Sequence, residues 1–262
     1  MTAIYSLHRT REISLTALIK VARRRSAGYA TMRAHFEGKC GLEFGGPSSI
    51  FSSNHLIPLY NTAASIDNCN FAQRTLWTTN DSNQRFGRRM GKQFIMEASD
   101  PAGIPNDSYD FVAASHILEH VANPLRALGQ WKRILRPSGT ILLVLPHKPH
   151  TFDHRRPFTK FDHIEADLKS NVSEADLTHM EEILALHDLD LDPRAGSPQE
   201  FRQRCLQNVS NRAMHHHVFS SELLVAMFSF LQMDILNLAI ERPHHIIVQA
   251  QKSKAVWQTP SL

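Results

Sequence analysis

The most constraining feature of this chain is a short segment in which an apolar run ends in an acidic residue and two glycines. It consists of Lys39-Cys-Gly-Leu-Glu-Phe-Gly-Gly-Pro-Ser48. We predict a buried strand followed at once by the start of a helix. Glycine lets main-chain N–H groups approach a ligand without a Cβ in the way, and a helix N-terminus offers free N–H donors to a carboxylate or a phosphate. Taken alone, the pattern fits either a nucleotide-type ligand or a tight turn without one.

After this segment the chain alternates between strand and helix patterns, which favours a doubly wound α/β sheet. Residues 148–219 are polar and His-rich and lack a strand pattern, so we predict a helical insertion there. The last two strands are expected to form a hairpin at the edge of the sheet. The predicted strands are Gly41–Phe44, Ala63–Asp67, Gln93–Ala98, Tyr109–Ser115, Thr140–Leu145, Met233–Ile240 and His245–Ala250, and the predicted helices are Pro124–Leu135, Ser173–Leu186 and Ser220–Leu231.

The composition favours a globular protein of the cytoplasm. Hydrophobic residues make up 42% of the chain and charged residues 21%, as in ordinary globular domains. There is no apolar run of about 18 residues, so no transmembrane helix is expected, and the first residues lack the pattern of a secretory signal. The three cysteines are scattered and odd in number, which favours reduced thiols over a disulfide framework.

Positive charge is concentrated in residues 1–39, a predicted helical arm with eight Lys and Arg residues against two acidic ones, a net charge of +6. Within it, Leu15, Leu18, Ile19 and Ala22 have the spacing of one helix face. Such a helix either packs on the domain with its arginines in solvent or binds nucleic acid or a membrane surface; we favour packing. Residues 40–252 form the predicted domain and residues 253–262 a tail.

The residues around the predicted fourth strand resemble those of class I S-adenosylmethionine-dependent methyltransferases. The relevant segments are Ser115-His-Ile-Leu-Glu-His-Val121, Asn123-Pro124, Leu135-Arg-Pro-Ser-Gly139 and the acid-rich stretch 95–110. The resemblance covers about residues 40–147 and 220–251. It implies a seven-stranded, mostly parallel sheet whose last strand is antiparallel, with S-adenosylmethionine bound at the carboxyl ends of the first strands.

The same resemblance implies a role for several single residues in binding the cofactor. Those matching the first strand and its turn, which hold the methionyl part, are Glu43, Gly45, Gly46 and Ser48. Asp67, taken as the end of the second strand, matches the acid that binds the ribose hydroxyls. The residues beside the adenine and at the end of strand four are Glu97, Ala98 and Ser115. The chain departs from the family at Pro47, which stands in place of a third glycine and has no N–H to donate.

A methyl transfer to oxygen or nitrogen needs a base for the proton of the acceptor, and histidine accepts protons near neutral pH. The chain has 16 histidines. We predict His147, His150 or His120 as the base, because these follow the fourth and fifth strands on the side expected to hold the cofactor. The residues predicted to contact a small-molecule or carbohydrate acceptor are His116, Asp153, Arg155 and Arg156. The alternative for the polar segment after strand five is that its salt bridges order the insertion.

Two histidine-containing motifs raise the question of a metal. Some relatives bind a divalent metal through a Glu-x-x-Glu-His motif, and this chain has His116, Glu119 and His120 at those positions. The run His215-His-His217 is a metal cluster by composition alone, but consecutive residues do not share one face. We therefore predict no metal, with Glu119 and His120 bracing the following helix and the His run closing over the pocket or facing solvent.

Three further functions compete with that of a methyltransferase. A nicotinamide oxidoreductase also has glycines and an acid after a strand, but the G-x-G-x-x-G motif is missing here. A non-catalytic protein with the methyltransferase fold would keep the same residues. A nucleic-acid or membrane-surface binder would use the basic residues before position 40. The sequence favours the methyltransferase and leaves the acceptor and the oligomeric state undetermined.

Overall fold

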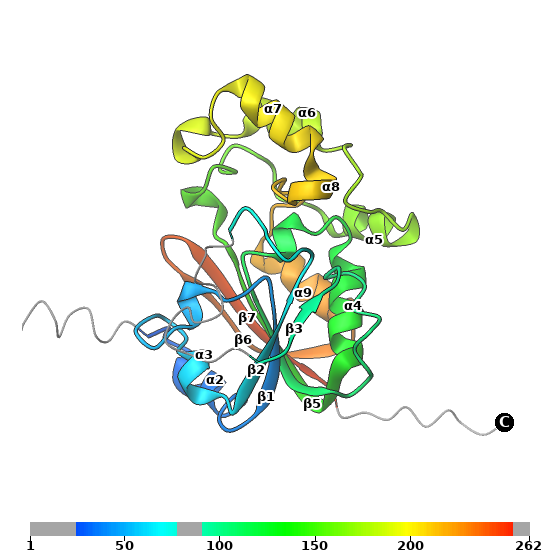
Figure 1. Ribbon diagram of the computed structural model, residues 1–262. Coiled ribbons are helices and arrows are strands. Elements are labelled where there is room, and N and C mark those ends of the chain that lie inside the picture. Colours follow the sequence, from blue (N-terminus) through cyan, green and yellow to red (C-terminus); the bar gives the residue numbers. More distant parts are fainter. Residues whose placement is uncertain (1–24, 78–90, 254–262) are drawn as a thin grey trace, which may run out of the picture.

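The computed structural model describes residues 25–77 and 91–253. Its centre is a seven-stranded sheet in the order β3-β2-β1-β4-β5-β7-β6, in which β7 pairs antiparallel with both of its neighbours and the remaining pairs are parallel. The strands are β1 Cys40–Phe44, β2 Ser65–Asn70, β3 Gln93–Ile95, β4 Tyr109–Ser115, β5 Leu135–Pro146, β6 Met233–Glu241 and β7 His245–Lys252. The predicted α/β class and closing hairpin are confirmed (Figure 1).

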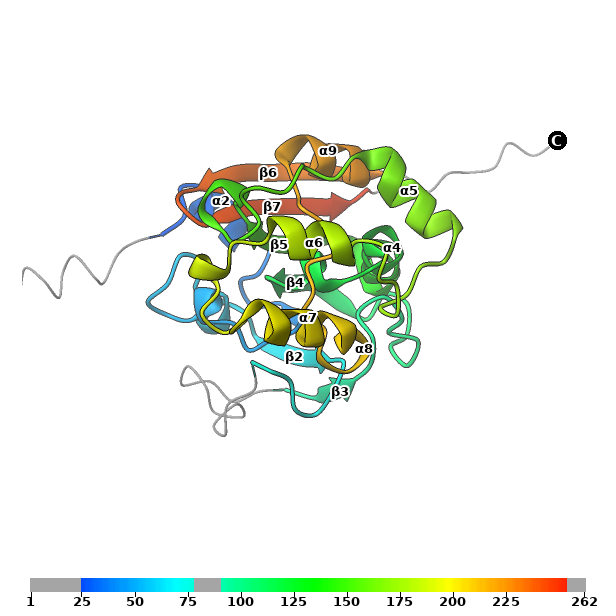
Figure 2. The ribbon, with the colours of Figure 1, turned by 90° about the horizontal axis from the view of Figure 1, so that it is seen from above.

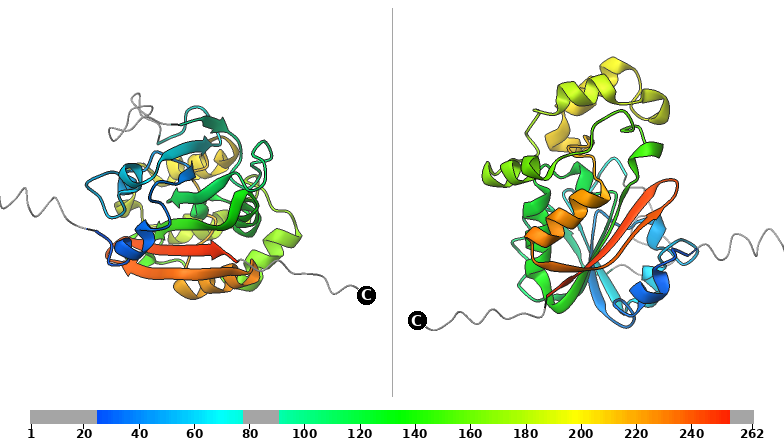
Figure 3. Two further views of the ribbon diagram at one scale, coloured as in Figure 1. Left: turned by 90° about the horizontal axis from the view of Figure 1, so that it is seen from below. Right: turned by 180° about the vertical axis from the view of Figure 1, so that it is seen from behind.

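Helices cover both faces of the sheet, as the view from behind in Figure 3 shows. One face packs against α4 and α9, and the other against α2 and α3. The helices are α2 Tyr29–Arg33, α3 Leu59–Thr62, α4 Pro124–Ile134, α5 Phe161–Lys169, α6 Met180–Leu186, α7 Pro198–Leu206, α8 Asn208–Asn211 and α9 Ser221–Phe230. None of the helices in the described part of the chain has the length and apolar character needed to cross a membrane.

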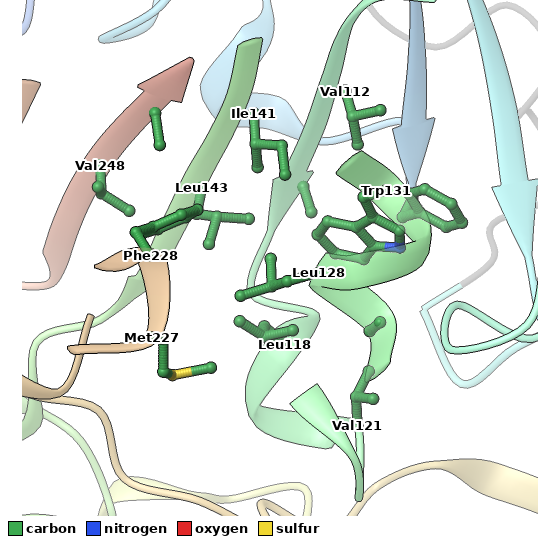
Figure 4. Packing of buried hydrophobic residues seen from close by; sticks show 14 of the residues in the cluster. Val112, Leu118, Val121, Leu128, Trp131, Ile141, Leu143, Met227, Phe228 and Val248 are labelled. Atoms are coloured by element: carbon green, nitrogen blue, oxygen red, sulfur yellow. The ribbon is translucent and has the colours of Figure 1, made fainter. Parts of the chain in front are cut away.

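The central strands bury side chains on both of their faces, which explains their continuous apolar sequences. In β5, Ile141 and Leu143 point into one layer of the core while Leu142 and Val144 point into the other. Figure 4 shows the first layer, in which Leu128 and Trp131 of α4 lie close to the sheet. This packing fixes the strand ends that surround the candidate site.

Helix α4 starts where the sequence predicts. The side chain of Asn123 accepts a hydrogen bond from the Arg126 N–H at 3.1 Å, and Pro124 occupies the first turn. An Asn cap satisfies a free N–H, and proline there loses no helical hydrogen bond. Helices α5 to α8 all lie within residues 148–219, and Figure 2 shows α6 and α7 crossing above the strands.

Several predicted boundaries are wrong. Strand β3 ends at Ile95 and not at Ala98, and β5 begins at Leu135 and not at Thr140. Strand β2 continues through Cys69, which pairs with Phe44, and ends at Asn70, so Asp67 lies within the strand. The predicted helix from Ser173 begins only at Met180, because the Asp176 side chain accepts hydrogen bonds from the main-chain N–H and hydroxyl of Thr178 and forms a turn instead.

Several predicted features lie outside the described residues. These are the helix face of Leu15, Leu18, Ile19 and Ala22, and the tail after residue 253. The described end of the predicted arm packs onto the sheet, because Met32 and Phe36 are fully buried in the layer below β4 and β5.

Candidate active site

The loop after β1 depends on two glycines for different reasons. Gly45 has a φ of +75°, which L-residues with a Cβ rarely adopt, and a Cβ there would lie 2.0 Å from Cδ1 of Ile117. A Cβ on Gly46 would lie 2.1 Å from the carboxyl carbon of Glu43. Gly45 therefore allows the backbone conformation of the loop, and both glycines allow the loop to pack directly against Ile117 and Glu43.

Glu43 supports this loop from beneath and does not line the cavity. It is fully buried, and its carboxylate accepts hydrogen bonds from the Ser48 N–H at 3.0 Å and the Tyr60 hydroxyl at 2.8 Å. Burial raises the pKa of Glu43 to about 7, while these donors oppose the shift. We infer that its role is to hold the loop in shape rather than to contact a ligand.

The carboxamides of β2 hold the loop from the side. The Nδ2 atoms of Asn68 and Asn70 donate to the carbonyl oxygen of Gly46 at 2.7 and 3.1 Å. Asn70 ends the strand and lines the cavity, whereas Asp67 does not. The carboxylate of Asp67 instead accepts from the Lys92 N–H at 2.8 Å and the Tyr109 hydroxyl at 2.7 Å. The strand-end position predicted for Asp67 thus belongs to Asn70.

A cavity of about 1320 Å³ opens between the carboxyl ends of the parallel strands and the insertion. Most small-molecule sites have volumes of about 300–1,000 Å³, so this one has room for two ligands side by side. Among the residues predicted from the sequence, those that line it are Gly45, Gly46, Ser48, Glu97, Ala98, Ser115, His116, His120 and His150. The strand ends thus bring together the glycine loop and three of the predicted histidines.

The residues predicted beside the adenine occupy the segment after β3. The Ala98 carbonyl oxygen accepts from Nε1 of Trp131 at 2.8 Å, which anchors this segment to α4. Glu97 faces the insertion and forms an ion pair with Arg212 at 2.5 Å. This pair connects the cofactor-side wall of the cavity to the segment after α8.

Asp153, Arg155 and Arg156, the residues predicted to contact the acceptor together with His116, do not line the large cavity. Arg156 is 1% exposed and bonds to Asp153, Glu182 and the carbonyl oxygen of His215. Arg155 pairs with Asp188 at 2.8 Å. Because a buried guanidinium needs partners for its donors, the charged segment after β5 joins the parts of the insertion together, as in the alternative given by the sequence.

His147, one of the predicted bases, also lies outside the cavity lining. The ring Nδ1 atom of His147 is 3.0 Å from the Pro243 carbonyl oxygen, and the main-chain N–H of His147 donates to the carbonyl oxygen of His244. The side chain therefore faces the β6–β7 hairpin. His150 lies on the following short turn, Lys148–His150, and lines the cavity.

The structure places a histidine at the cavity that the sequence did not single out as a base. Nδ1 of His215 lies 2.5 Å from Oδ2 of Asp153, which is 3% exposed and is held in turn by Arg156. Burial alone would lower the pKa of His215, but the Asp153 carboxylate raises it overall. An aspartate that accepts from Nδ1 leaves Nε2 of a neutral imidazole free to accept a proton.

His120 is less suited to the role of a base. Burial, assisted by the nearby His215, lowers the pKa of His120 to about 3, so its imidazole stays neutral and binds protons weakly at physiological pH. Its ring packs edge-on against that of His215, with centroids 4.4 Å apart. Its position therefore suits orienting His215, and its neutral imidazole could also coordinate a metal ion.

Glu119 completes this group with an unusual environment. It is 1% exposed, and neither carboxylate oxygen has a hydrogen-bond partner among the described residues, although Nδ1 of His116 lies 3.5 Å from its Oε1. Glu119, His120 and His215 each offer a donor atom within 4.8 Å of the others. Buried carboxylates rarely lack hydrogen bonds, so this set has the chemistry of a metal site, a role that the sequence did not favour.

Several solved structures of methyltransferases align with most of this chain, at low sequence identity and TM-scores under 0.5. A 1,6-didemethyltoxoflavin-N1-methyltransferase from Burkholderia thailandensis aligns with 92% of this chain and 83% of its own, at 11% identity and a TM-score of 0.49. S-adenosylmethionine-dependent methyltransferases from Aquifex aeolicus and Mesorhizobium loti align with 90% and 86% of this chain and 97% and 98% of theirs, at 10% and 13% identity and TM-scores of 0.48 and 0.47. TM-scores at this level do not indicate which acceptor this chain methylates.

None of the curated proteins compared with this chain matches it significantly in sequence. A family model does match, that of the methyltransferase domain, over residues 18–228. The glycine loop that a Cβ would fill and the wide cavity beside it fit S-adenosylmethionine. Because the model spans most of the chain, this protein belongs to the methyltransferase domain family and is an S-adenosylmethionine-dependent enzyme with the class I fold.

Proposed function

We propose that the enzyme methylates an oxygen or nitrogen atom of a small-molecule or sugar-like acceptor, with His215 as the general base. The observation that carries this proposal is the His215–Asp153 pair at the cavity wall. S-adenosylmethionine, when bound, offers an activated methyl group on a positively charged sulfur. The protein has to align the acceptor with that group, and His215 Nε2 takes the proton that the acceptor loses as its new bond to carbon forms.

The cofactor would lie along the glycine loop. Because Gly45 and Gly46 have no Cβ, the main chain of the loop can approach the cofactor closely. Asn70, at the end of β2, takes the position expected of the residue that contacts the ribose. Glu97 and Ala98 would flank the adenine, and Ser115 the sulfur end. Asn70 has one carboxamide oxygen to accept from a hydroxyl, where a carboxylate would have two.

The charges around the cavity favour a small acceptor over a nucleic acid. Two of the three arginines that line it are already paired, Arg204 with Asp192 at 2.6 Å and Arg212 with Glu97 at 2.5 Å. Nucleic-acid sites depend on cations that neutralise phosphates. His150 also lines the cavity, and we propose that its ring nitrogens hydrogen-bond the hydroxyl or amine groups of the acceptor. His116 lines the cavity too, but its Nε2 lies 3.0 Å from Nδ1 of His245 and its Nδ1 lies 3.5 Å from Oε1 of Glu119.

A second candidate function is a metal-assisted methyl transfer, favoured by the buried Glu119 carboxylate, which accepts no hydrogen bond from the described residues, beside His120 and His215. In that case these three residues would hold a divalent cation, which lowers the pKa of a bound hydroxyl. The two candidates differ in what happens when Glu119 is replaced by glutamine: transfer through His215 as base persists, and metal-assisted transfer stops.

The proposed function can be tested by measuring release of S-adenosylhomocysteine with panels of phenols, sugars and amines. We expect turnover with at least one hydroxyl or amine acceptor, and a rise in Tm of about 5 °C or more with S-adenosylhomocysteine at 100 times its Kd. NAD and a short oligonucleotide should leave Tm unchanged. Turnover confined to carbon or thiol acceptors would contradict the proposed acceptor chemistry.

The proposed exchange of roles in β2 predicts opposite effects for two substitutions. Asn70→Ala should weaken S-adenosylhomocysteine binding about 10-fold, because it removes a hydrogen-bonding group at the cavity. Asp67→Ala should leave this affinity unchanged. It should lower the free energy of unfolding by about 1–2 kcal/mol, since the Lys92 N–H and the Tyr109 hydroxyl lose their acceptor. Titration calorimetry and urea unfolding measure the two quantities. Weaker binding in Asp67→Ala alone would restore the assignment made from the sequence.

A further inference from the structure

A second group of histidines lies away from the cofactor cavity, where the insertion meets the sheet domain. His163 and Asp167 are four residues apart on α5 and so share one helix face. His179 immediately precedes α6, and His217 lies in the segment that leads into α9. Each of the four offers a donor atom within 4.8 Å of the others. None of them lines the large cavity.

The spacing of these donors is that of metal ligands. Nε2 of His163 lies 3.0 Å from Nε2 of His179 and 3.3 Å from Oδ2 of Asp167. Zinc in structural sites is tetrahedral with bonds of about 2.0–2.2 Å, so its ligand atoms stand about 3.3–3.5 Å apart. The two distances from His163 are thus close to the edge of such a tetrahedron, and the remaining donor atoms, including that of His217, lie within 4.8 Å of one another.

Two of the donor groups are buried with an atom that makes no hydrogen bond. Asp167 is 7% exposed, and its Oδ2 atom makes no hydrogen bond within the described residues, although the ring nitrogens of His163 and His217 lie 3.3 and 3.6 Å from it. His217 is 1% exposed; its Nε2 lies 3.1 Å from the Ala122 carbonyl oxygen, while its Nδ1 has no partner in the described chain. Unpaired buried polar atoms are uncommon in folded proteins. Zinc ligands commonly have one ring nitrogen bonded to a carbonyl oxygen in this way.

We propose that His163, Asp167, His179 and His217 bind one structural zinc ion. Three imidazoles and a carboxylate suit zinc among the common divalent cations, and four protein ligands leave no open position for catalysis. The ion would tie α5 and the start of α6 to the segment 213–219. That segment is anchored to the sheet domain by Ala122 and also carries His215, so zinc would fix the insertion above the cavity.

The test is to strip the full-length protein with a chelator, dialyse it against zinc and measure bound metal by mass spectrometry. We expect one zinc per chain at this site and a Tm about 5 °C or more above that of the stripped protein when zinc is at 100 times its Kd. His179→Ala and the nearly isosteric Asp167→Asn should lose this ion and the rise in Tm. His35→Ala, which removes a histidine on the turn after α2, should keep both.

A His120→Ala variant separates this site from the donors at the cavity. Zinc retained in His120→Ala and lost in His179→Ala supports the proposal. Zinc lost in His120→Ala and retained in His179→Ala would place the ion at Glu119, His120 and His215 and overturn it. Wild-type protein that binds no zinc at micromolar concentrations overturns it as well, whether or not any variant folds. Cobalt substitution adds a spectroscopic check, because tetrahedral cobalt absorbs visible light strongly.

Discussion

Replacing His215 by alanine should lower the rate of methyl transfer at saturating cofactor by about 100-fold or more, the usual contribution of a general base. S-adenosylhomocysteine affinity should change little, because His215 lies at the insertion side of the cavity and the glycine loop lies on the strand side. Single-turnover kinetics with an identified acceptor measure the rate, and calorimetry the affinity. An unchanged rate would exclude His215 as the base.

The pH dependence gives a second, independent sign of this role. The base must be neutral, so the rate should rise as pH increases through the pKa of His215, which Asp153 holds above the ordinary value of 6.5. Asp153→Asn removes the anionic partner, so the rising limb should move to lower pH even if the maximal rate falls. A purely structural role of Asp153 would lower the rate without moving the limb.

Glu119→Gln is the matched control for the metal-assisted alternative. Glutamine keeps the shape of the side chain but removes the charge that a cation needs. If His215 acts as a base without metal, this variant should retain most of its activity. Activity that disappears in Glu119→Gln, together with loss of a bound metal ion that His179→Ala retains, would favour the metal at Glu119, His120 and His215.

The fold was predictable because its signals are local. Apolar runs indicated β4 and β5, and the Asn123-Pro124 pair indicated the start of α4. The turn residues Arg242-Pro243-His244 indicated where the two strands of the hairpin separate. The end of β2 was missed because an acidic residue within a strand resembles a strand end. Cys69, a small apolar residue two positions after Asp67, was the available signal that the strand continued.

The site was less predictable because its key contacts join distant parts of the sequence. The Asp153–His215 pair spans 62 residues and the Glu97–Arg212 pair spans 115. Polarity alone does not tell an arginine that faces an acceptor from one that is buried among carboxylates. Arg156 was therefore predicted as a substrate contact, although it donates four hydrogen bonds inside the insertion.

Replacing Gly45 by alanine should weaken S-adenosylhomocysteine binding by about 100-fold or more. Alanine at a φ of +75° costs about 1–2 kcal/mol on its own, and its Cβ would also collide with Ile117. The loop must then move, which disturbs the N–H groups that approach the cofactor and the contact of Gly46 with Asn68. Calorimetry with S-adenosylhomocysteine measures the loss.

Gly38→Ala separates the two causes. Gly38 has a similar φ of +70°, but a Cβ there would meet nothing within 4 Å, and the residue does not line the cavity. It should therefore show the backbone cost alone, about 1–2 kcal/mol in urea unfolding, with unchanged cofactor affinity. Gly45→Ala should exceed this loss of stability and also lose affinity. A loop that holds the cofactor cannot move by the width of a methyl group without altering binding. If both variants bind S-adenosylhomocysteine as the wild type does, the glycine loop does not hold the cofactor.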